Sequence, residues 1–367
     1  MIKHIITVLF IGFYSLALSQ YSFTPVKEIK CTPIKSQDRT GTCWSFATSS
    51  FLESEIIKKT GKQIDISEMY IVRNIYLDKA KNYVLRQGKA NFSQGSLSHD
   101  LIRIMAKDGI VPESAFTGRY PDEQKHNHGE MEAGLKGFLD GVISQKKISS
   151  KWPKAVKAVL DVYLGTAPEK FTHDAKSYTP RSFADFIDLS PENYISMSSF
   201  THHPFYRKFI LEIPDNYSNG SFYNVPLDEL LSTINNALDN GYSIAWDGDV
   251  SEKGFSAKEG IAVLPTDIKR KDLFTSPGTE TEVSQENRQM AFESFETTDD
   301  HLMHIVGTAK DQNGNKYYII KNSWGEISPY KGYLYMSESY LKMKTVAVMI
   351  NKKAIPKATS KKLFVNQ

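Results

Sequence analysis

Cysteine is scarce in this sequence: only Cys31 and Cys43 occur among 367 residues. A chain of this length buries enough apolar surface to fold without disulfides, so neither cysteine is needed as a crosslink. The net charge is only +3 at pH 7, and the lysines are spread along the chain apart from a cluster near the C-terminus. The composition therefore gives no reason to expect a nucleic acid partner.

Patterns typical of metal and cofactor sites are also missing from the sequence. The doublet His202-His203 has no nearby partner that would complete a tetrahedral ligand set. The sequence contains no glycine-rich loop of the kind that holds phosphates. We therefore predict neither a metal nor a cofactor.

Long hydrophobic runs are absent after the first 16 residues. The chain starts Met1-Ile2-Lys3-His4, continues with a mostly apolar stretch at residues 5–16, and then has the small residues Ala17 and Ser19. This order is typical of a signal peptide, and the run is shorter than the roughly 20 residues of a membrane span. We predict a signal peptide at residues 1–19 and an exported protein, periplasmic or extracellular, without membrane contact once the peptide is removed.

Helical periodicity dominates the first part of the mature chain. Residues 43–59 have apolar side chains at helical spacing, lysines in the last turn, and Gly61 as a C-cap. Similar signals predict four further helices, at 67–81, 98–109, 152–164 and 226–240. Residues 311–315 form a hairpin turn, and four strands are predicted after the last helix, at 242–246, 304–309, 317–321 and 333–336.

A nucleophile and a base can be assigned from their positions in these elements. Cys43 begins a predicted helix, and the positive end of a helix lowers the pKa of a thiol. An imidazole is the base that such a thiol needs, and we assign this role to His304. His301 is the competitor, on the opposite face if the strand extends that far. We prefer His304 because it runs directly into an apolar strand, whereas His301 reads as loop.

Three further side chains have roles around this pair. Asn322, on the strand that the hairpin pairs with that of His304, can hold the distal ring nitrogen, and Trp324 can shield that bond from water. The side-chain amide of Gln37 can stabilise the oxyanion of a tetrahedral intermediate together with the backbone N–H of Cys43. These roles predict a cysteine nucleophile that hydrolyses amides through a thioester.

Two of these segments resemble known motifs. Residues 37–47, which include Gln37, Cys43 and Trp44, resemble the cysteine box of the papain superfamily, and residues 318–325 resemble its asparagine box. Further likeness to the bleomycin hydrolase and aminopeptidase C branch occurs at 163–171, 224–230, 247–250 and 331–336. The resemblance implies catalytic roles for Cys43, His304, Asn322 and Gln37, with Trp44 and Trp324 in support.

The same resemblance implies a fold and a domain plan. The fold is α+β and papain-like, with a helical left half, a β-barrel-like right half, and the active-site cleft between them. We expect one peptidase domain at 20–367, made of a helical subdomain at about 20–225, an insertion at about 127–194 within it, a β-rich subdomain at about 226–350, and a tail at 351–367. The hexamers of this branch are an analogy for the oligomeric state.

The sequence departs from the family pattern in three places. Thr40 stands where cathepsin-like enzymes carry a disulfide cysteine, so that bridge is absent. The branch is usually intracellular, whereas this chain starts with a signal peptide. Aminopeptidases of the branch place a C-terminal arm in the cleft to hold the free amine of the substrate, and the tail here is short.

We therefore predict a cysteine peptidase that acts on peptides or proteins, as an aminopeptidase or an endopeptidase. Two alternatives stay open at this point. One is a peptide-binding relative without catalysis, and the other is an amidase or acyl transferase with the same Cys-His-Asn chemistry. Cys31 is interpreted as a structural thiol.

Overall fold

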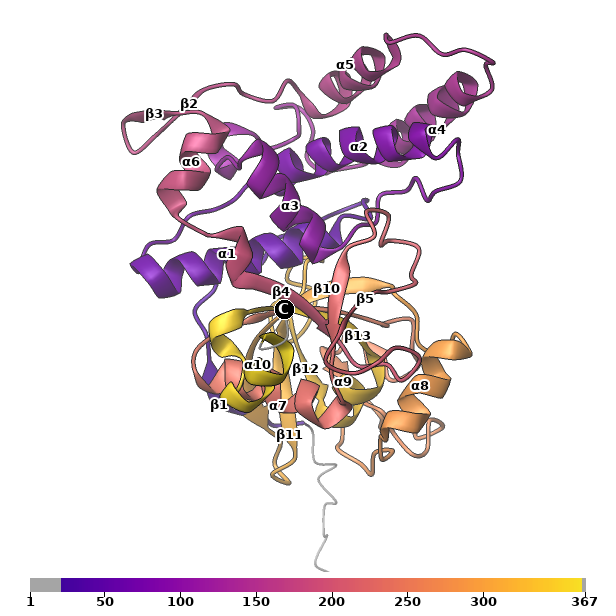
Figure 1. Cartoon of the computed structure of the whole chain (residues 1–367). Coiled ribbons are helices and arrows are strands. Elements are labelled where there is room, and N and C mark those ends of the chain that lie inside the picture. The colour runs from indigo at the N-terminus through magenta and orange to yellow at the C-terminus, as the bar shows by residue number, and fades with distance from the viewer. Residues whose placement is uncertain (1–20, 365–367) are drawn as a thin grey trace, which may run out of the picture.

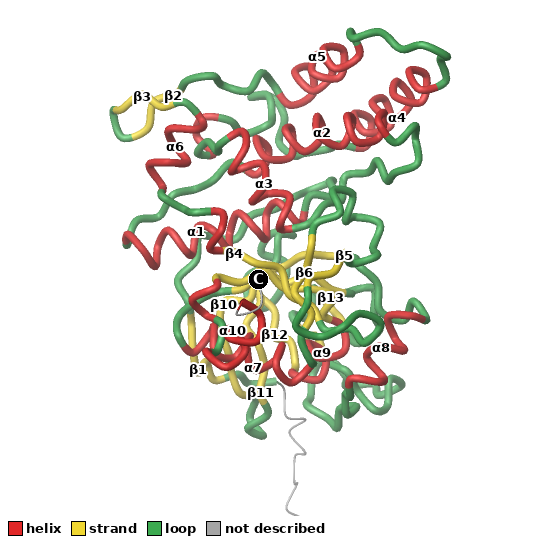
Figure 2. The backbone as a smooth tube through the Cα atoms, in the orientation of Figure 1, coloured by secondary structure: helices red, strands yellow, loops and turns green. Residues whose placement is uncertain are grey.

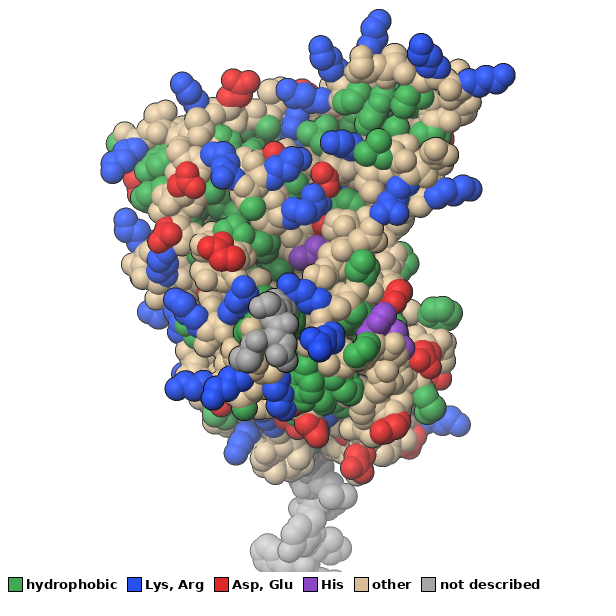
Figure 3. All heavy atoms as spheres, viewed as in Figure 1, with side chains coloured by type: hydrophobic (Ala, Val, Ile, Leu, Met, Phe, Trp, Pro, Cys, Tyr) green, Lys and Arg blue, Asp and Glu red, His purple; other side chains and the backbone are tan. Residues whose placement is uncertain are grey.

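The protein has a helical half and a β half, which lie at the top and bottom of Figure 1. The computed structural model describes residues 21–364, so the expected signal peptide at 1–19 lies outside the described residues. None of the helices in this described part is long and apolar enough to cross a membrane. The outline of the molecule is indented where the two halves meet, and charged side chains of both signs are scattered over the face in Figure 3.

The helical half is built around α1 (Cys43–Thr60), which lies against the sheet. Every residue of α1 from Cys43 to Ile57 is buried, because other helices cover its far side. Gly61 ends α1 at φ 72°, a conformation that favours glycine. The other elements of this half are α2 (Glu68–Leu85), α3 (Ser98–Asp108), η1 (Glu113–Ala115), α4 (Gly129–Ile143), α5 (Trp152–Leu164), the hairpin β2 (Phe171–His173) and β3 (Lys176–Tyr178), and α6 (Pro180–Ile187).

The β half contains one 11-stranded sheet in the order β5-β6-β4-β13-β7-β10-β11-β12-β9-β8, with β1 paired to β10. Its strands are β1 (Thr24–Glu28), β4 (Tyr194–Ser198), β5 (Lys208–Ile210), β6 (Ser221–Asn224), β7 (Ile244–Gly248), β8 (Phe255–Ser256), β9 (Ile261–Ala262), β10 (His301–Lys310), β11 (Lys316–Lys321), β12 (Tyr333–Ser337) and β13 (Thr345–Asn351). The accompanying helices are η2 (Pro191–Asn193), α7 (Leu227–Asp239), α8 (Gln285–Glu293), α9 (Glu338–Lys344), η3 (Lys352–Ala354) and α10 (Lys357–Phe364).

The hairpin of β10 and β11 contains a bulge that changes its register. Near the turn, Lys310 pairs with Lys316 and Gly307 with Ile319. Beyond Val306 the register is shifted by one residue, so that His304 pairs with Lys321. Because alternate residues of a strand face opposite sides, this single extra residue decides which side chains meet Asn322.

The architecture corrects two sequence expectations and confirms the α+β class. The sheet is open among the described residues, since its path ends at β5 and β8, and it is not a closed barrel. The expected boundary near residue 225 also needs correction, because β1, β4, β5 and β6 precede it and belong to the same sheet. The helices predicted at 43–59, 67–81, 98–109, 152–164 and 226–240 are all present as α1, α2, α3, α5 and α7.

The C-terminal tail folds back on the β half as α10. Thr359 and Lys362 of this helix bond to Glu229 of α7, and Phe364 packs edge-on against Tyr223. Leu363 is buried in the core of the β half. The described part of the tail is therefore anchored on α7 and β6.

Candidate active site

Cys43 is the first residue of α1, at the junction of the two halves. The carbonyl of Thr42 accepts the N–H of Ser45 at 2.9 Å, which closes the first turn behind the thiol. The backbone N–H of Leu302, on β10, donates a hydrogen bond to the Cys43 sulfur. This bond brings the thiol against the residue that directly follows His301.

Gln37 is fixed in the loop that precedes α1. Its Nε2 donates to the carbonyl of Thr40 at 2.6 Å, and its Oε1 accepts from the hydroxyl of Ser323 at 2.7 Å. The backbone N–H of Gln37 donates to the carbonyl of Ser323 at 2.8 Å. The cysteine and asparagine boxes, nearly 300 residues apart in sequence, are thus joined through Gln37 and Ser323.

His301 is the histidine that meets Asn322. Its Nε2 lies 2.8 Å from Oδ1 of Asn322, which also accepts the backbone N–H of Ser323 at 2.7 Å. The indole of Trp324 stacks on the His301 ring, with centroids 4.4 Å apart and planes at 29°. The bond to Asn322 fixes the tautomer that carries its proton on Nε2, so Nδ1 is the nitrogen left with a free lone pair.

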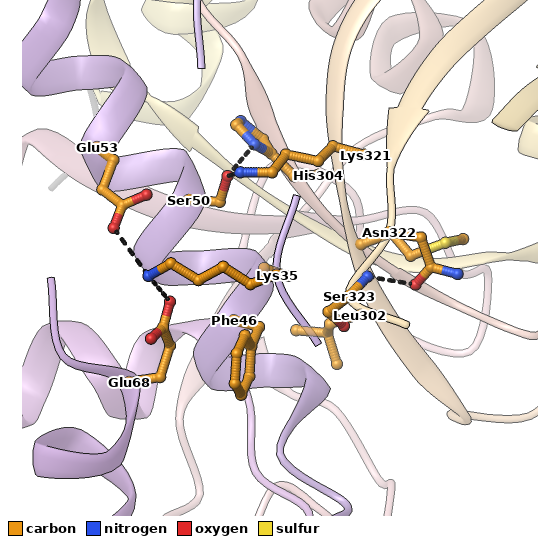
Figure 4. A pocket seen from close by; sticks show the side chains of 12 residues that line it. Lys35, Phe46, Ser50, Glu53, Glu68, Leu302, His304, Lys321, Asn322 and Ser323 are labelled. Atoms are coloured by element: carbon orange, nitrogen blue, oxygen red, sulfur yellow. Dashed lines mark hydrogen bonds and ion pairs between the residues drawn. The ribbon is translucent and has the colours of Figure 1, made fainter. Parts of the chain in front are cut away.

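The prediction that Asn322 holds the ring of His304 is wrong. Nδ1 of His304 bonds to the hydroxyl of Ser50 on α1 at 2.9 Å, and its Nε2 has no hydrogen-bond partner among the described residues. Lys321, directly opposite on β11, also donates to Ser50, at 2.7 Å. Figure 4 shows the side chains of His304 and Lys321 pointing toward α1, and that of Asn322 pointing the other way.

The register explains this correction. His301 and His304 are three residues apart on β10, so they face opposite sides of the strand, as expected from sequence. Without the bulge at Val306, the pairing near the turn would have placed His304 opposite Asn322. The extra residue exchanges the two faces and leaves His301 on the face of Asn322.

The remaining predicted residues occupy defined positions. Trp44 is almost fully buried, and its Nε1 donates to the carbonyl of Gln94 at 2.9 Å. Cys31 and Cys43 are both free, and the Cys31 sulfur lies 3.4 Å from the hydroxyl of Tyr333. Cys31 therefore takes no part in a disulfide with Cys43.

Burial favours the neutral forms of both candidate reacting groups, contrary to the lowered thiol pKa expected at the start of a helix. It raises the pKa of the Cys43 thiol to about 12, an effect that the Leu302 N–H opposes and the charges of nearby carboxylates reinforce. It lowers the pKa of His301 to about 4, although the bond to Asn322 and the charge of Asp300 act the other way. A thiol and an imidazole in these states have the protonation that a thiol donor and a general base require.

Comparison with known proteins identifies the family. The profile described as "Peptidase C1-like family" matches residues 146–366, and that described as "Papain family cysteine protease" matches residues 21–167. The chain belongs to the peptidase C1-like family. The predicted papain-like cysteine peptidase is thereby confirmed as an enzyme class.

Several characterised relatives resemble this peptidase over most of its length. It is 24% identical to aminopeptidase G of Lactobacillus delbrueckii subsp. lactis, with 90% of this chain and 83% of the relative covered. The identity to aminopeptidase C of Lactobacillus helveticus is 25%, with 89% and 80% covered, and that to bleomycin hydrolase of Mus musculus is 22%, with 92% and 84% covered. The predicted aminopeptidase C and bleomycin hydrolase branch is confirmed by these matches.

A solved structure supports the fold of the peptidase. The crystal structure of pepw from Lactobacillus rhamnosis HN001 superposes with a TM-score of 0.72 at 21% identity, covering 94% of this chain and 85% of that one. At this identity the likeness concerns the fold, which is papain-like with helical and sheet portions as predicted.

Proposed function

We propose that this peptidase is a cysteine aminopeptidase in which Cys43 is the nucleophile, His301 the general base, Asn322 the residue that orients the base, and Gln37 an oxyanion donor. The observation that carries the proposal is the 2.8 Å contact between Nε2 of His301 and Oδ1 of Asn322, on the strand whose Leu302 N–H bonds to the sulfur of Cys43. His304 has no part in this proposal, because its ring faces Ser50.

The geometry supports a two-step reaction. Nδ1 of His301 takes the proton of Cys43 as the sulfur bonds to the scissile carbonyl carbon, and the carbonyl oxygen becomes an oxyanion near Gln37 and the backbone N–H of Cys43. His301 then gives the proton to the departing amine, which leaves a thioester on Cys43. Water, deprotonated by His301, hydrolyses the thioester and restores the thiol.

The electrostatics favour proton transfer during attack over a preformed ion pair. Burial disfavours both the thiolate of Cys43 and the imidazolium of His301, so neither charge is stable alone. The N-terminus of α1 and the bond from His301 to Asn322 stabilise the two charges as they form together.

The aminopeptidase mode is supported by the names of the relatives, several of which are aminopeptidases. The test is digestion of one peptide with a free and with an acetylated N-terminus, read by mass spectrometry. We expect stepwise loss of N-terminal residues from the free peptide and slow or no cleavage of the acetylated one. Internal cleavage of both peptides at similar rates would refute the aminopeptidase mode, and cleavage by Cys43→Ala would refute the nucleophile.

Export of the enzyme is a further part of the proposal. It rests on the basic start, the apolar stretch at residues 5–16 and the small residues that follow. N-terminal sequencing of the mature protein should start at Gln20, and a mature protein that retains Met1 would contradict export by this route. The hexamer suggested by family analogy stays a prediction that light scattering of the purified enzyme tests.

A further inference from the structure

Three carboxyl groups from separate elements act on the thiol of Cys43. The charges of Asp299, Asp215 and Asp247 each raise the pKa of that thiol. Asp247 is on β7, Asp299 lies two residues before His301, and Asp215 is in the loop between β5 and β6. The surroundings of the nucleophile are therefore acidic, although nothing in the thioester chemistry requires it.

Asp247 is buried, and among the described residues its side chain shares a hydrogen bond only with another acid, Asp299. It pairs with Leu302, the residue whose backbone N–H reaches the Cys43 sulfur, so its side chain shares a face with that of Leu302. The residue is 4% exposed, and apart from Asp299 neither oxygen of its carboxyl group has a hydrogen-bond partner within residues 21–364. The group beside it is a second carboxyl, that of Asp299.

Asp299 connects this pair to an open hollow. Its Oδ2 also lacks a hydrogen-bond partner within residues 21–364. The carboxylate lines a hollow of about 500 Å³ between α8 and the loop that precedes β6, whose walls include Ile213, Pro214, Phe292 and Phe295. A ligand group in this hollow can approach the acidic pair from the solvent side.

Asp215 lies against the helical half. Its Oδ1 accepts a hydrogen bond from Nδ2 of Asn91 at 3.1 Å, which ties the β5–β6 loop to the helical half. A β-carbon at Gly95 would overlap the Asp215 carboxylate, so the absence of a side chain there permits the approach. The loop thereby carries a third carboxylate across the junction of the two halves.

Among the described residues, Lys79 acts through its charge on Asp215, but no Lys, Arg or His forms a salt bridge with Asp215 or with the acidic pair Asp247 and Asp299. Burial and the neighbouring carboxylates raise the pKa of Asp247 well above its ordinary value, and burial raises that of Asp299 to about 7. A buried carboxyl group whose only side-chain partner is a second acid is costly to ionise, so the retention of Asp247 and Asp299 near the nucleophile points to a ligand that supplies positive charge.

We propose that Asp247 and Asp299, with Asp215 facing them, bind the free α-ammonium group of the peptide substrate. The inference rests on the proposed aminopeptidase function and names the residues that restrict it to N-termini. The α-nitrogen of an N-terminal residue is two bonds from the carbonyl carbon that Cys43 attacks. Carboxylates that act directly on the sulfur are therefore in the right place for this group, whereas the ammonium of a lysine side chain extends several bonds farther from the reacting carbon.

Binding of the ammonium would also assist the chemistry. The cation would offset the negative charge of these carboxyl groups, which opposes ionisation of Cys43. A blocked N-terminus would lose this contribution and would leave an acyl group against buried carboxyl groups. Substrates with a free amine should therefore have a higher kcat as well as a lower KM than blocked substrates.

The test measures binding and turnover separately. Leu-Gly-Gly and acetyl-Leu-Gly-Gly are titrated calorimetrically into Cys43→Ala protein, with and without Asp247→Asn, Asp299→Asn or both. The active enzyme with the same aspartate changes is assayed on leucyl-coumarylamide and its acetylated form. Asp239→Asn, an exposed carboxylate at the end of α7, serves as the control for loss of one charge.

We expect each aspartate change to lower the preference for the free amine at least tenfold, in binding and in kcat/KM, with a larger loss in the double variant and none in Asp239→Asn. An unchanged preference in folded variants would overturn the proposal. The side-chain ammonium of a substrate lysine is the other source of a cation, and acetyl-Lys-Leu-coumarylamide is compared with its norleucine analogue to test it. The proposal would also be overturned if the aspartate changes abolished a preference for lysine and left the preference for a free amine unchanged. Because the calorimetry uses inactive protein, failure of the peptidase chemistry would not affect this result.

Discussion

The Nε2 atom of His301 lies 2.8 Å from Oδ1 of Asn322, while the ring of His304, on the other face of β10, bonds to Ser50. The two histidines are separated by only three residues, yet they belong to different environments. One ring is covered by Trp324 at the junction of the halves, and the other is part of a buried polar chain with Lys321 and α1. This relationship assigns the base of the proposed reaction to His301 and a structural role to His304.

Removal of the Asn322 side chain should weaken catalysis without removing it. In Asn322→Ala the His301 ring loses the acceptor at Nε2 but keeps its stacking on Trp324. We expect kcat to fall roughly 10- to 100-fold, a part of the 10²–10⁴ contribution of a positioned acid–base group. Steady-state kinetics on a free-amine substrate provide the measurement, with Asn313→Ala in the exposed hairpin turn as control. Equal kcat values for the two variants would argue against an orienting role.

Loss of the Gln37 amide should reduce the stabilisation of the oxyanion. An oxyanion donor contributes about 10²–10³ in kcat in other enzymes, and we expect a loss of this order in Gln37→Ala. KM should change little, because the oxyanion exists only after attack. Since Gln37 also holds Thr40 and Ser323, circular dichroism must show that the variant is folded. A rise in KM at unchanged kcat would contradict the assignment, and Gln124→Ala is the exposed control.

The buried acidic pair should make stability depend on pH. The pKa of Asp247 is raised in the folded protein, so folding favours its protonated form, and the associated stability is lost as pH rises from about 4 through the folded pKa. The pKa of Asp247 is also raised by the charges of the neighbouring carboxyl groups, Asp299, Asp215 and Asp300. Asp247→Asn removes this titration.

We therefore expect Asp247→Asn to gain free energy of unfolding relative to the unchanged protein as pH increases from 5 to 8. Each unit by which the folded pKa exceeds its ordinary value corresponds to about 1.4 kcal/mol. Urea unfolding at both pH values measures the difference. A gap that is constant or shrinks with pH would show that Asp247 is not a buried acid with a raised pKa.

Local signals in the sequence were sufficient for most of the fold. The start of α1 at Cys43 and its end before Gly61 follow from apolar spacing and capping, which act within one or two turns of helix. The hairpin turn at 311–315 likewise has its own signal. Cys43 and Asn322 lie at the ends of these recognisable segments, so the sequence places both at the edge of an element, whereas Gln37 lies in the loop before α1.

The base could not be chosen in this way. Its identity depends on the bulge at Val306, where one extra residue on β10 exchanges the faces of His301 and His304. The one signal within that strand is Gly307, directly after the extra residue, because an isolated glycine in a strand often accompanies a bulge or a close backbone approach. The acidic pair was missed for a related reason: Asp247 and Asp299 are far apart in sequence and meet only through the pairing of β7 with β10.

The most direct test compares the two histidines by kcat/KM on one free-amine substrate. His301→Ala should lower kcat/KM at least 10³-fold and slow alkylation of Cys43 by iodoacetamide, because the thiol loses its base. His304→Gln keeps a polar group opposite Ser50, so its kcat/KM should stay within fivefold of that of the unchanged enzyme. Its free energy of unfolding should fall by roughly 1–3 kcal/mol. The reverse pattern, an inactive His304→Gln that is folded beside an active His301→Ala, would contradict the account.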